Sequence, residues 1–491
     1  MNRKFSTILA MAVATSICGS AFAQQPGETG ALGERVEQID VISMTVSEAA
    51  DEGLRIFTTP FNKLDGYGDG PINPADTTTP GGRPTLQGNG TLLRVNGLDA
   101  QACFECHTLV SNATVPATLG IGGAGGTNSN AMFQPVAMDP GDGDLDGIAG
   151  FTGRFINPPF VFGVGGVELV GLEMTADLQT LKQQAIDNPF TTVVLETKGV
   201  NFGVIQADGL GNVDTSGVLG IEHDLVVRPF GRKGEFPTTR DFDVGAMQFH
   251  FGMQSTESVG VDNDADGDGV VNEITVGELS SLSVFLSTLA RPVQARVEGN
   301  AVAGEGLFSS MGCADCHIPT LQTDSQLLPL RFPQVATDPW QNVYKYVDLT
   351  KKPAGFDPNG NGGVKVPMFS DLKRHDMGPD LAEDFGLATE QQNREFITAK
   401  LWGVVDSGPW LHDGRALTIS DAILLHGGEA QSARDAFEDL TDAERIAVLD
   451  FLRTLQTPKP NQGGGGGVRP HPRLQSAEVT DTGVHTISRR D

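Results

Sequence analysis

Apolar residues recur at helical spacing in two stretches of the chain, residues 277–289 and 442–455. In each stretch an apolar side chain returns every three or four positions, which places these side chains on one face of a helix. A proline follows each stretch, Pro292 after the first and Pro458 after the second. Because proline cannot continue a helix, the pattern predicts two amphipathic helices that end before these prolines.

A second pair of stretches, residues 50–57 and 303–308, shares the pattern Ala-x-Glu-Gly-Leu with a Phe close behind. Each predicts a short helix, so a short helix followed by an amphipathic helix occurs twice, which indicates an internal repeat. The 62 Gly and 28 Pro favour many turns and irregular connections. We expect a mainly α protein with two domains, 24–294 and 295–460, and a long loop-rich insert in the first domain.

The two ends of the chain differ in composition from the rest. Residues 1–23 carry Arg3 and Lys4, an apolar run and the sequence Ala-Phe-Ala at 21–23, which is typical of a cleavable signal peptide. The apolar run is shorter than the ~20 residues of a membrane span, and we expect no membrane span elsewhere. The protein is therefore predicted to be periplasmic or secreted. The glycine-rich tail, 461–491, is predicted to be disordered.

The charge of the chain narrows the classes of partner. Among the 491 residues, 62 Asp and Glu stand against 34 Lys and Arg, which gives a formal net charge of −28. A surface that coats nucleic acid is basic, so this balance argues against nucleic acid as a partner and favours basic ones.

Four cysteines remain after the predicted signal, and they form two copies of the pattern C-x-x-C-H. The residues are Cys103, Cys106 and His107 in the first copy, and Cys313, Cys316 and His317 in the second. This pattern is the attachment signature of c-type haem, in which both thiols bond to the haem and the histidine becomes an iron ligand. Disulfides, a zinc site and thioredoxin-like pairs are the alternatives. We predict two covalent haems as cofactors.

Further stretches carry a family resemblance: Leu-Trp-Gly at 401–403, Pro-Trp-Leu-His-Asp-Gly-Arg-Ala at 409–416 and His-Gly-Gly-Glu-Ala at 426–430. Together with the two haem motifs, they resemble the di-haem oxidoreductase family related to bacterial di-haem cytochrome c peroxidases. The resemblance implies two cytochrome c-like domains, and it implies an enzyme that reduces hydrogen peroxide with electrons from a small cytochrome c or cupredoxin-like donor.

Two other functions stay open at this point. One is an oxygenase or oxidase of the rubber-cleaving or methylamine type, and the other is a di-haem electron carrier without enzymatic activity. Fold and family do not fix the reaction. An enzyme needs one haem that is open to its substrate, whereas a carrier would have two six-coordinate irons.

The resemblance also implies roles for residues around the second haem. The position of its far-side iron ligand in the family is occupied here by His426. A bis-His iron formed by His317 and His426 would be closed to peroxide and would relay electrons. His375 and Met377 are the rival ligands.

The first haem is predicted to be the peroxide site. Where the related peroxidases have a closing histidine, this chain has Gly123. The iron is then either open or capped by His250 or Met253. The family also places a catalytic Glu about sixty residues after the first motif, to move a proton between the oxygens of peroxide. Glu168 and Glu173 are the two candidates.

An acidic stretch predicts a calcium site. Asp262, Asp264, Asp266 and Asp268, with Glu273, resemble an EF-hand-like loop, whose carboxylate oxygens suit a hard cation. A register that starts at Asp264 is the alternative, and a solvated acidic turn is the simpler interpretation.

Overall fold

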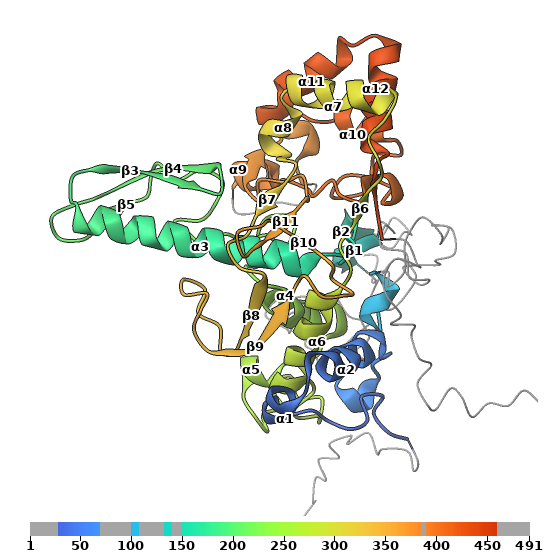
Figure 1. Cartoon of the computed structure of the whole chain (residues 1–491). Helices are drawn as coiled ribbons and strands as arrows, with labels where there is room; N and C mark the ends of the chain where they lie inside the picture. The colour runs from blue at the N-terminus through green and yellow to red at the C-terminus, as the bar shows by residue number, and fades with distance from the viewer. Residues whose placement is uncertain (1–27, 69–99, 108–131, 140–149, 384–388, 459–491) are drawn as a thin grey trace, which may run out of the picture.

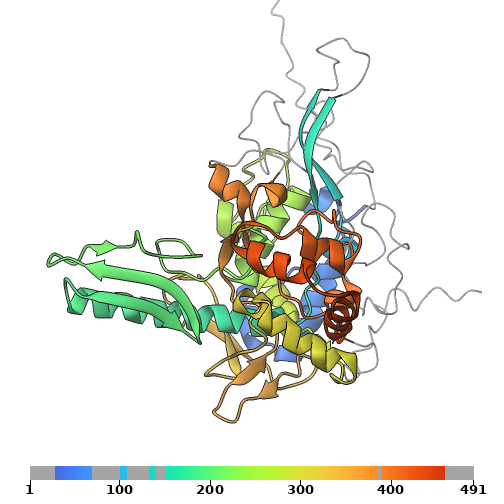
Figure 2. The same ribbon diagram turned by 90° about the horizontal axis from the view of Figure 1, so that it is seen from above.

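The computed structural model describes residues 28–68, 100–107, 132–139, 150–383 and 389–458. Helices gather at the two ends of the molecule, and a long helix runs between them and projects to one side (Figure 1). The view from above shows that this projection extends well beyond the rest of the described chain (Figure 2). The predicted signal peptide and tail lie outside the described residues.

One end of the molecule is built on the helices α2 (Val46–Thr58) and α6 (Val276–Thr288). Thr45 and Thr275 cap their first turns. The helices cross at Gly53, where a Cβ atom would lie 2.1 Å from the carbonyl oxygen of Ser281. Only glycine allows so close an approach, so Gly53 marks the helix crossing.

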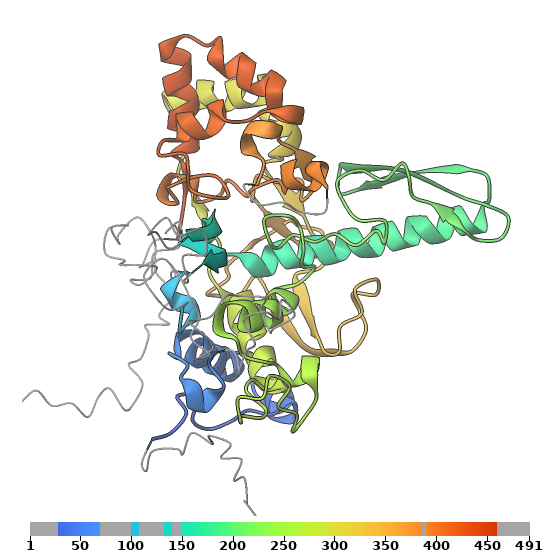
Figure 3. The same ribbon diagram turned by 180° about the vertical axis from the view of Figure 1, so that it is seen from behind.

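The other end repeats this arrangement with α7 (Asn300–Ser310) and α12 (Asp442–Leu452). A Cβ atom at Gly304 would lie 1.9 Å from the carbonyl oxygen of Ala447. The rings of Phe308 and Phe451 pack beside the crossing with centroids 5.4 Å apart. The four helices predicted from the sequence are thus confirmed, and they form two similar pairs (Figure 3).

The insert of the first half differs from the loop-rich expectation. It contains α3 (Val164–Asp187) and the antiparallel strands β3 (Thr192–Thr197), β4 (Val200–Ala207) and β5 (Val213–Asp214), which lie along α3. The start of α3 carries several glycines. They are close-packing positions, since a Cβ atom at Gly166 would lie 2.4 Å from the ring of Phe356.

Short strands connect the larger elements. The remaining strands are β1 (Met132–Asp139), β2 (Gly150–Ile156), β6 (Val293–Gln294), β7 (Leu321–Gln322), β8 (Leu327–Arg331), β9 (Val343–Asp348), β10 (Asp357–Pro358), β11 (Val364–Val366), β12 (Arg374–Asp376), β13 (Glu395–Ile397) and β14 (Leu455–Gln456). They form antiparallel sheets of two or three strands, in the orders β1-β2, β10-β11-β7, β12-β13, β14-β6 and β8-β9.

Short helices complete the described chain. The α-helices are α1 (Gln38–Ser43), α4 (Thr239–Ala246), α5 (Thr256–Val259), α8 (Cys313–Cys316), α9 (Glu390–Arg394), α10 (Ile419–Leu424) and α11 (Gln431–Glu438). The 3₁₀-helical turns are η1 (Lys63–Asp65), η3 (Cys103–Glu105), η6 (Pro379–Leu381), η7 (Val404–Asp406) and η8 (Gly428–Ala430). One π-helical turn, η5 (Met247–Phe251), follows α4. Within the described ranges, no helix combines the length and apolar character that crossing a membrane requires.

Three hydrophobic clusters form the core. The largest surrounds α3, and each of the other two lies beside one C-x-x-C-H motif. Cys103 and Cys106 pack against the cluster that contains Phe57 and Phe285, whereas Cys313 packs against the cluster that contains Phe451. Each pair of crossed helices therefore provides an apolar wall next to one motif.

The crossing of α7 and α12 gives a first prediction. Gly304→Ala should lower the free energy of unfolding by about 1–3 kcal/mol, because the added methyl group overlaps backbone atoms of Ala447. Gly306→Ala, in the same helix but with no atom within 4 Å of its Cβ position, should raise stability by about 0.5–1 kcal/mol. Denaturant unfolding measures both. Equal effects of the two substitutions would contradict the assigned crossing.

Candidate functional site

The first C-x-x-C-H motif folds as the turn η3, and neither of its cysteines forms a disulfide. Burial raises the pKa of Cys103, so its sulfur is a neutral thiol. The Nδ1 of His107 lies 2.7 Å from the carbonyl oxygen of Pro159 and must donate to it. Burial lowers the pKa of His107 to about 4. The ring is therefore neutral, and its Nε2 lone pair is available to a metal.

The second motif has the same arrangement. It forms α8, and burial raises the pKa of the Cys313 thiol to about 11. The Nδ1 of His317 donates to the carbonyl oxygen of Phe369 at 3.1 Å. In both halves the acceptor follows its histidine by 52 residues. Each predicted iron-ligating histidine is thus oriented by a backbone carbonyl, which is the usual support of a histidine ligand.

His426 lies just after α10 and faces the second motif. Its Nδ1 donates to the carbonyl oxygen of Ala422 at 2.7 Å, so its Nε2 is also available to a metal. Burial lowers the pKa of His426, and it also lowers the pKa of His317 to about 4, with a further contribution from the nearby His426. The structure therefore brings together the two histidines predicted for the second haem.

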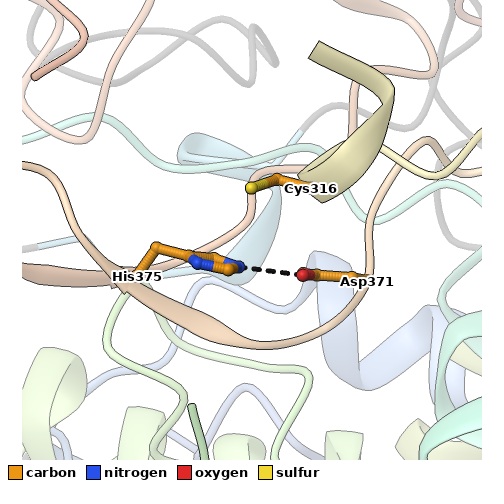
Figure 4. Close-up of side chains that lie close together, drawn as sticks. All are labelled: Cys316, Asp371 and His375. Carbon is orange, nitrogen blue, oxygen red and sulfur yellow. Dashed lines mark hydrogen bonds and ion pairs between the residues drawn. The ribbon is translucent and has the colours of Figure 1, made fainter. Parts of the chain in front are cut away.

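The rival ligand His375 is held by carboxylates on both sides. Its Nε2 lies 2.8 Å from Asp371 and its Nδ1 lies 2.8 Å from Glu429. Burial alone would lower the pKa of His375, but hydrogen bonds to Asp371, Cys316 and Glu429 raise it to about 11. Cys316, Asp371 and His375 point toward one another (Figure 4). An imidazolium bonded at both nitrogens cannot bind iron, so the geometry favours His426.

The residues predicted to face the first haem iron opposite His107 differ from those of the second motif. Gly123 lies outside the described residues. His250 lies in the π-helical turn η5 and is near enough to His107 to lower its pKa. Met253 is fully buried in the cluster against which Cys103 packs. Both predicted capping residues therefore belong to this pocket.

Glu168 is fixed inside α3, with a relative exposure of 1%. Its Oε2 accepts hydrogen bonds from the backbone N–H and the hydroxyl group of Thr239, at 3.0 and 2.8 Å. Burial raises the pKa of Glu168, although these hydrogen bonds oppose the effect. Val164, one turn earlier in α3, packs against the cluster of the first motif. Glu168 thus lies at the edge of the first pocket.

Glu173, the other candidate, has a different environment. Its carboxylate pairs with the ammonium group of Lys198 at 2.7 Å and accepts backbone N–H bonds from Asp324 and Ser325 at 2.7 and 2.9 Å. Five residues turn an α-helix by well over a quarter of a circle, so Glu173 and Glu168 face different neighbours. Glu173 joins α3 to the β3-β4 hairpin and to the loop after β7, which is a structural role.

Asp243, in α4, is a buried acid near Glu168 that sequence reasoning missed. Its signal in the sequence was an acidic residue among the apolar neighbours Phe242 and Val244.

The predicted calcium loop is only partly assembled. Asp264, Asp266 and Asp268 place one oxygen each within 4.8 Å of one another. The carboxylate of Asp262 instead accepts a hydrogen bond from the side chain of Asn272 at 2.8 Å. Burial, together with the three nearby aspartates, raises the pKa of Glu273 to about 9. The arrangement corresponds to the register that starts at Asp264, and calcium itself stays a prediction.

The same turn, followed by a capped helix, occurs once near each motif. Phe230 bridges to Phe236, and Trp410 bridges to Ala416 in the same way. Two residues after each bridge, Thr238 and Thr418 cap the helices α4 and α10, and each hydroxyl group accepts the N–H of an aspartate three residues on. The two halves of the chain thus place α4 and α10 equivalently, one at each motif.

These features define a protein with two similar sites, each with a cysteine pair and a histidine whose Nδ1 is fixed by a backbone carbonyl group. Residues 359–455 match the family model described as "Di-haem oxidoreductase, putative peroxidase". The match confirms, over this part of the chain, the resemblance to the di-haem oxidoreductase family stated above. The family implies haem cofactors and an oxidoreductase.

Two solved structures are similar to this chain at low identity. Hydrazine synthase from Kuenenia stuttgartiensis, pressurized with 20 bar xenon, is 15% identical over 93% of this chain and 100% of its own, with a TM-score of 0.31. A MauG-like protein associated with microbial copper homeostasis is 13% identical over 51% of this chain and 78% of its own, with a TM-score of 0.28. No curated protein matches the chain.

The two candidate ligands of the second haem give a second prediction. In the haem-loaded protein, His426→Ala should convert one low-spin haem to high-spin, because an iron ligand is lost. His375→Ala is the matched control and should leave both haem signals as they are in the wild type, because both His375 nitrogens bond to carboxylates. Electron paramagnetic resonance distinguishes the two spin states. A high-spin conversion in the His375 variant alone would reverse the assignment.

Proposed function

We propose that this protein is an exported c-type di-haem oxidoreductase in which two cytochrome c-like domains each bind one haem covalently. Four cysteines in two C-x-x-C-H turns, none of them in a disulfide, support the covalent bonds. The two crossed helix pairs, each beside one motif, support the two domains. When bound, each haem supplies a redox-active iron. His107 and His317 would ligate the two irons, and His426 would complete the second.

The reaction that we propose is the reduction of hydrogen peroxide, H2O2 + 2 e− + 2 H+ → 2 H2O, with electrons from a small donor protein. The observation that carries it is the difference between the two equivalent helices. His426 stands eight residues after the cap Thr418, and the residue eight after the cap Thr238 is Ala246. The second pocket therefore has a ligand that the first lacks at the equivalent position, while the first has the buried carboxyl group of Glu168.

Glu168 would serve as the proton shuttle of the first pocket. A group that takes a proton from one oxygen of peroxide and returns it to the other needs a pKa near the working pH. Burial raises the pKa of Glu168 in this direction. The two bonds to Thr239 hold one carboxylate oxygen in place. The side chain is thus fixed in position, as an effective proton shuttle must be.

One observation favours a second function, that of an electron carrier. His250 lies near His107 in the same manner as His426 lies near His317. If His250 closes the first iron in all redox states, neither haem could bind peroxide. A high-spin signal in either redox state of the purified protein would favour the enzyme, whereas two low-spin haems in both states would favour the carrier.

The expected donor is a small basic cytochrome c or cupredoxin-like protein. The formal net charge of −28 supports a basic partner, because opposite charges speed the encounter of electron-transfer proteins. Export to the periplasm or beyond fits both the predicted signal peptide and the covalent haem motifs. Calcium at Asp264, Asp266 and Asp268 belongs to the same proposal, as a structural ion.

Covalent attachment gives a third prediction. Mass spectrometry of the mature protein should find the mass of two haems. Replacing both Cys103 and Cys106 with Ala should leave one haem, because the thioether bonds of the first motif can no longer form. An intact protein that carries fewer than two haems would contradict the assignment.

The choice between the two glutamates gives a fourth prediction. Glu168→Gln keeps the size of the side chain but removes its titratable proton, and it should lower peroxide turnover by on the order of 10²-fold. Glu173→Gln is the matched control in the same helix, and turnover should stay within a few-fold of the wild type. A reduced donor cytochrome and peroxide provide the assay, and both haem spectra should be unchanged. Full turnover in Glu168→Gln would end the proposed shuttle role.

A further inference from the structure

Asp243 is a buried carboxyl group whose position has no structural explanation. Its relative exposure is 7%, and its Oδ2 has no hydrogen-bond partner in the described part of the chain. An ionised carboxylate in such a place would lose its hydration without compensation, which costs several kcal/mol by order of magnitude. A buried polar atom of this kind calls for either a neutral form or a function.

The location of Asp243 connects it to the first pocket. It stands one helical turn after Thr239, the residue that binds Glu168 through its N–H and hydroxyl groups. Residues four apart share one face of a helix, so Asp243 and the anchor of Glu168 lie on the same side of α4. Cys103, a haem-attachment residue, is close enough to Asp243 for the two groups to interact electrostatically.

The charges around Asp243 leave it without a cation of its own. Arg240 pairs with Glu257 from α5 and donates to the hydroxyl group of Ser280 in α6 at 2.7 Å. Arg331, from β8, faces Glu168 and Asp241. The titratable and charged groups that face Asp243 are Glu168, Arg240, Asp241, Glu257 and Cys103. Acidic groups outnumber the two arginines in this region, so one or more of the acids must hold a proton.

Asp243 is the acid with the strongest reason to be protonated. Burial, together with the nearby Glu168, raises the pKa of Asp243 well above its usual range, although Arg240 opposes the shift. Protonation also explains how the Oδ2 of Asp243 can be buried without a hydrogen-bond partner, because a neutral acid loses far less hydration energy than a carboxylate.

We propose that Asp243 is a positioning residue that stores a proton for Glu168 at the first haem pocket. This inference rests on the function proposed above. Glu168 takes one proton from peroxide and returns it, so its own cycle supplies no net proton. The reduction of peroxide to two waters consumes two protons together with the two electrons of the donor. Asp243 gives one of these protons to Glu168, becomes a carboxylate, and is reprotonated from solvent before the next turnover. The second proton comes directly from solvent.

Infrared spectroscopy of the haem-loaded protein tests the stored proton without any turnover. The wild type should show the carbonyl band of protonated carboxylic acids at neutral pH. Asp243→Asn should lose the part of this band that belongs to Asp243, whereas the part that belongs to Glu273, whose pKa is about 9, should remain in both proteins. Asp187→Asn, an exposed acid at the far end of α3, is the matched control and should change no such band. A wild type without the band, or a band unaffected in Asp243→Asn, overturns the proposal, and the wild-type measurement holds even if the variant folds poorly.

The pH dependence of peroxide turnover tests the transfer to Glu168. Without the proton held by Asp243, Glu168 must take its proton from bulk water, whose proton concentration falls tenfold per pH unit. Turnover of Asp243→Asn should therefore fall by about tenfold per pH unit above neutrality. The wild type should stay flatter, and Asp243→Glu, which keeps the carboxyl group, should restore the flatter profile. Parallel profiles for wild type and Asp243→Asn overturn the proposal. Absence of turnover in the wild type overturns the proposed function instead, and the infrared band then decides separately whether Asp243 holds a proton.

Discussion

The orientation of His107 and His317 is the constraint on which the rest of the structure depends. An imidazole binds a metal well only when its other nitrogen is fixed as a donor. Here the acceptors are the carbonyl groups of Pro159 and Phe369, which lie far along the chain from their histidines. In each half, the chain that follows the motif must therefore fold back so that its carbonyl group reaches the histidine. In the first half that connection leads directly into α3, so the fixing of His107 also places Glu168.

Charge is distributed differently in the two pockets. Around the second motif the carboxylates of Asp371 and Glu429 each pair with His375 through one oxygen, and their other oxygens accept backbone N–H groups. Around the first motif, Glu168 and Asp243 are buried with fewer cations than acids. Low dielectric surroundings make proton binding the main way to reduce such a charge. The surroundings of the first motif therefore favour protonated acids, whereas the acids near the second motif are paired with His375.

The sequence predicted the parts of the molecule that depend on local pattern. The repeated helices and the two motifs follow from spacing alone, and His426 follows from the family resemblance. The environments of Glu168 and Glu173 could not be predicted, because their partners Thr239 and Lys198 are distant along the chain. Asp243 was missed for the same reason: its burial arises from the packing of α3, α4 and α6. The insert was predicted to be loop-rich from the overall glycine and proline content, which is a poor guide because close packing and turns both select glycine.

The difference between the pockets arises where two equivalent helices end. α10 stops at Leu424, and the chain then turns through Gly427 and Gly428, where a Cβ atom on Gly428 would lie 2.0 Å from the carbonyl oxygen of Asp376. This turn leaves His426 at a helix end, facing His317. α4 continues to Ala246 and widens into η5. The position equivalent to His426 is therefore occupied by Ala246, a small apolar residue inside a helix. Because the start of both helices is the same, it is the glycine turn that separates a ligand-bearing pocket from an acid-bearing one.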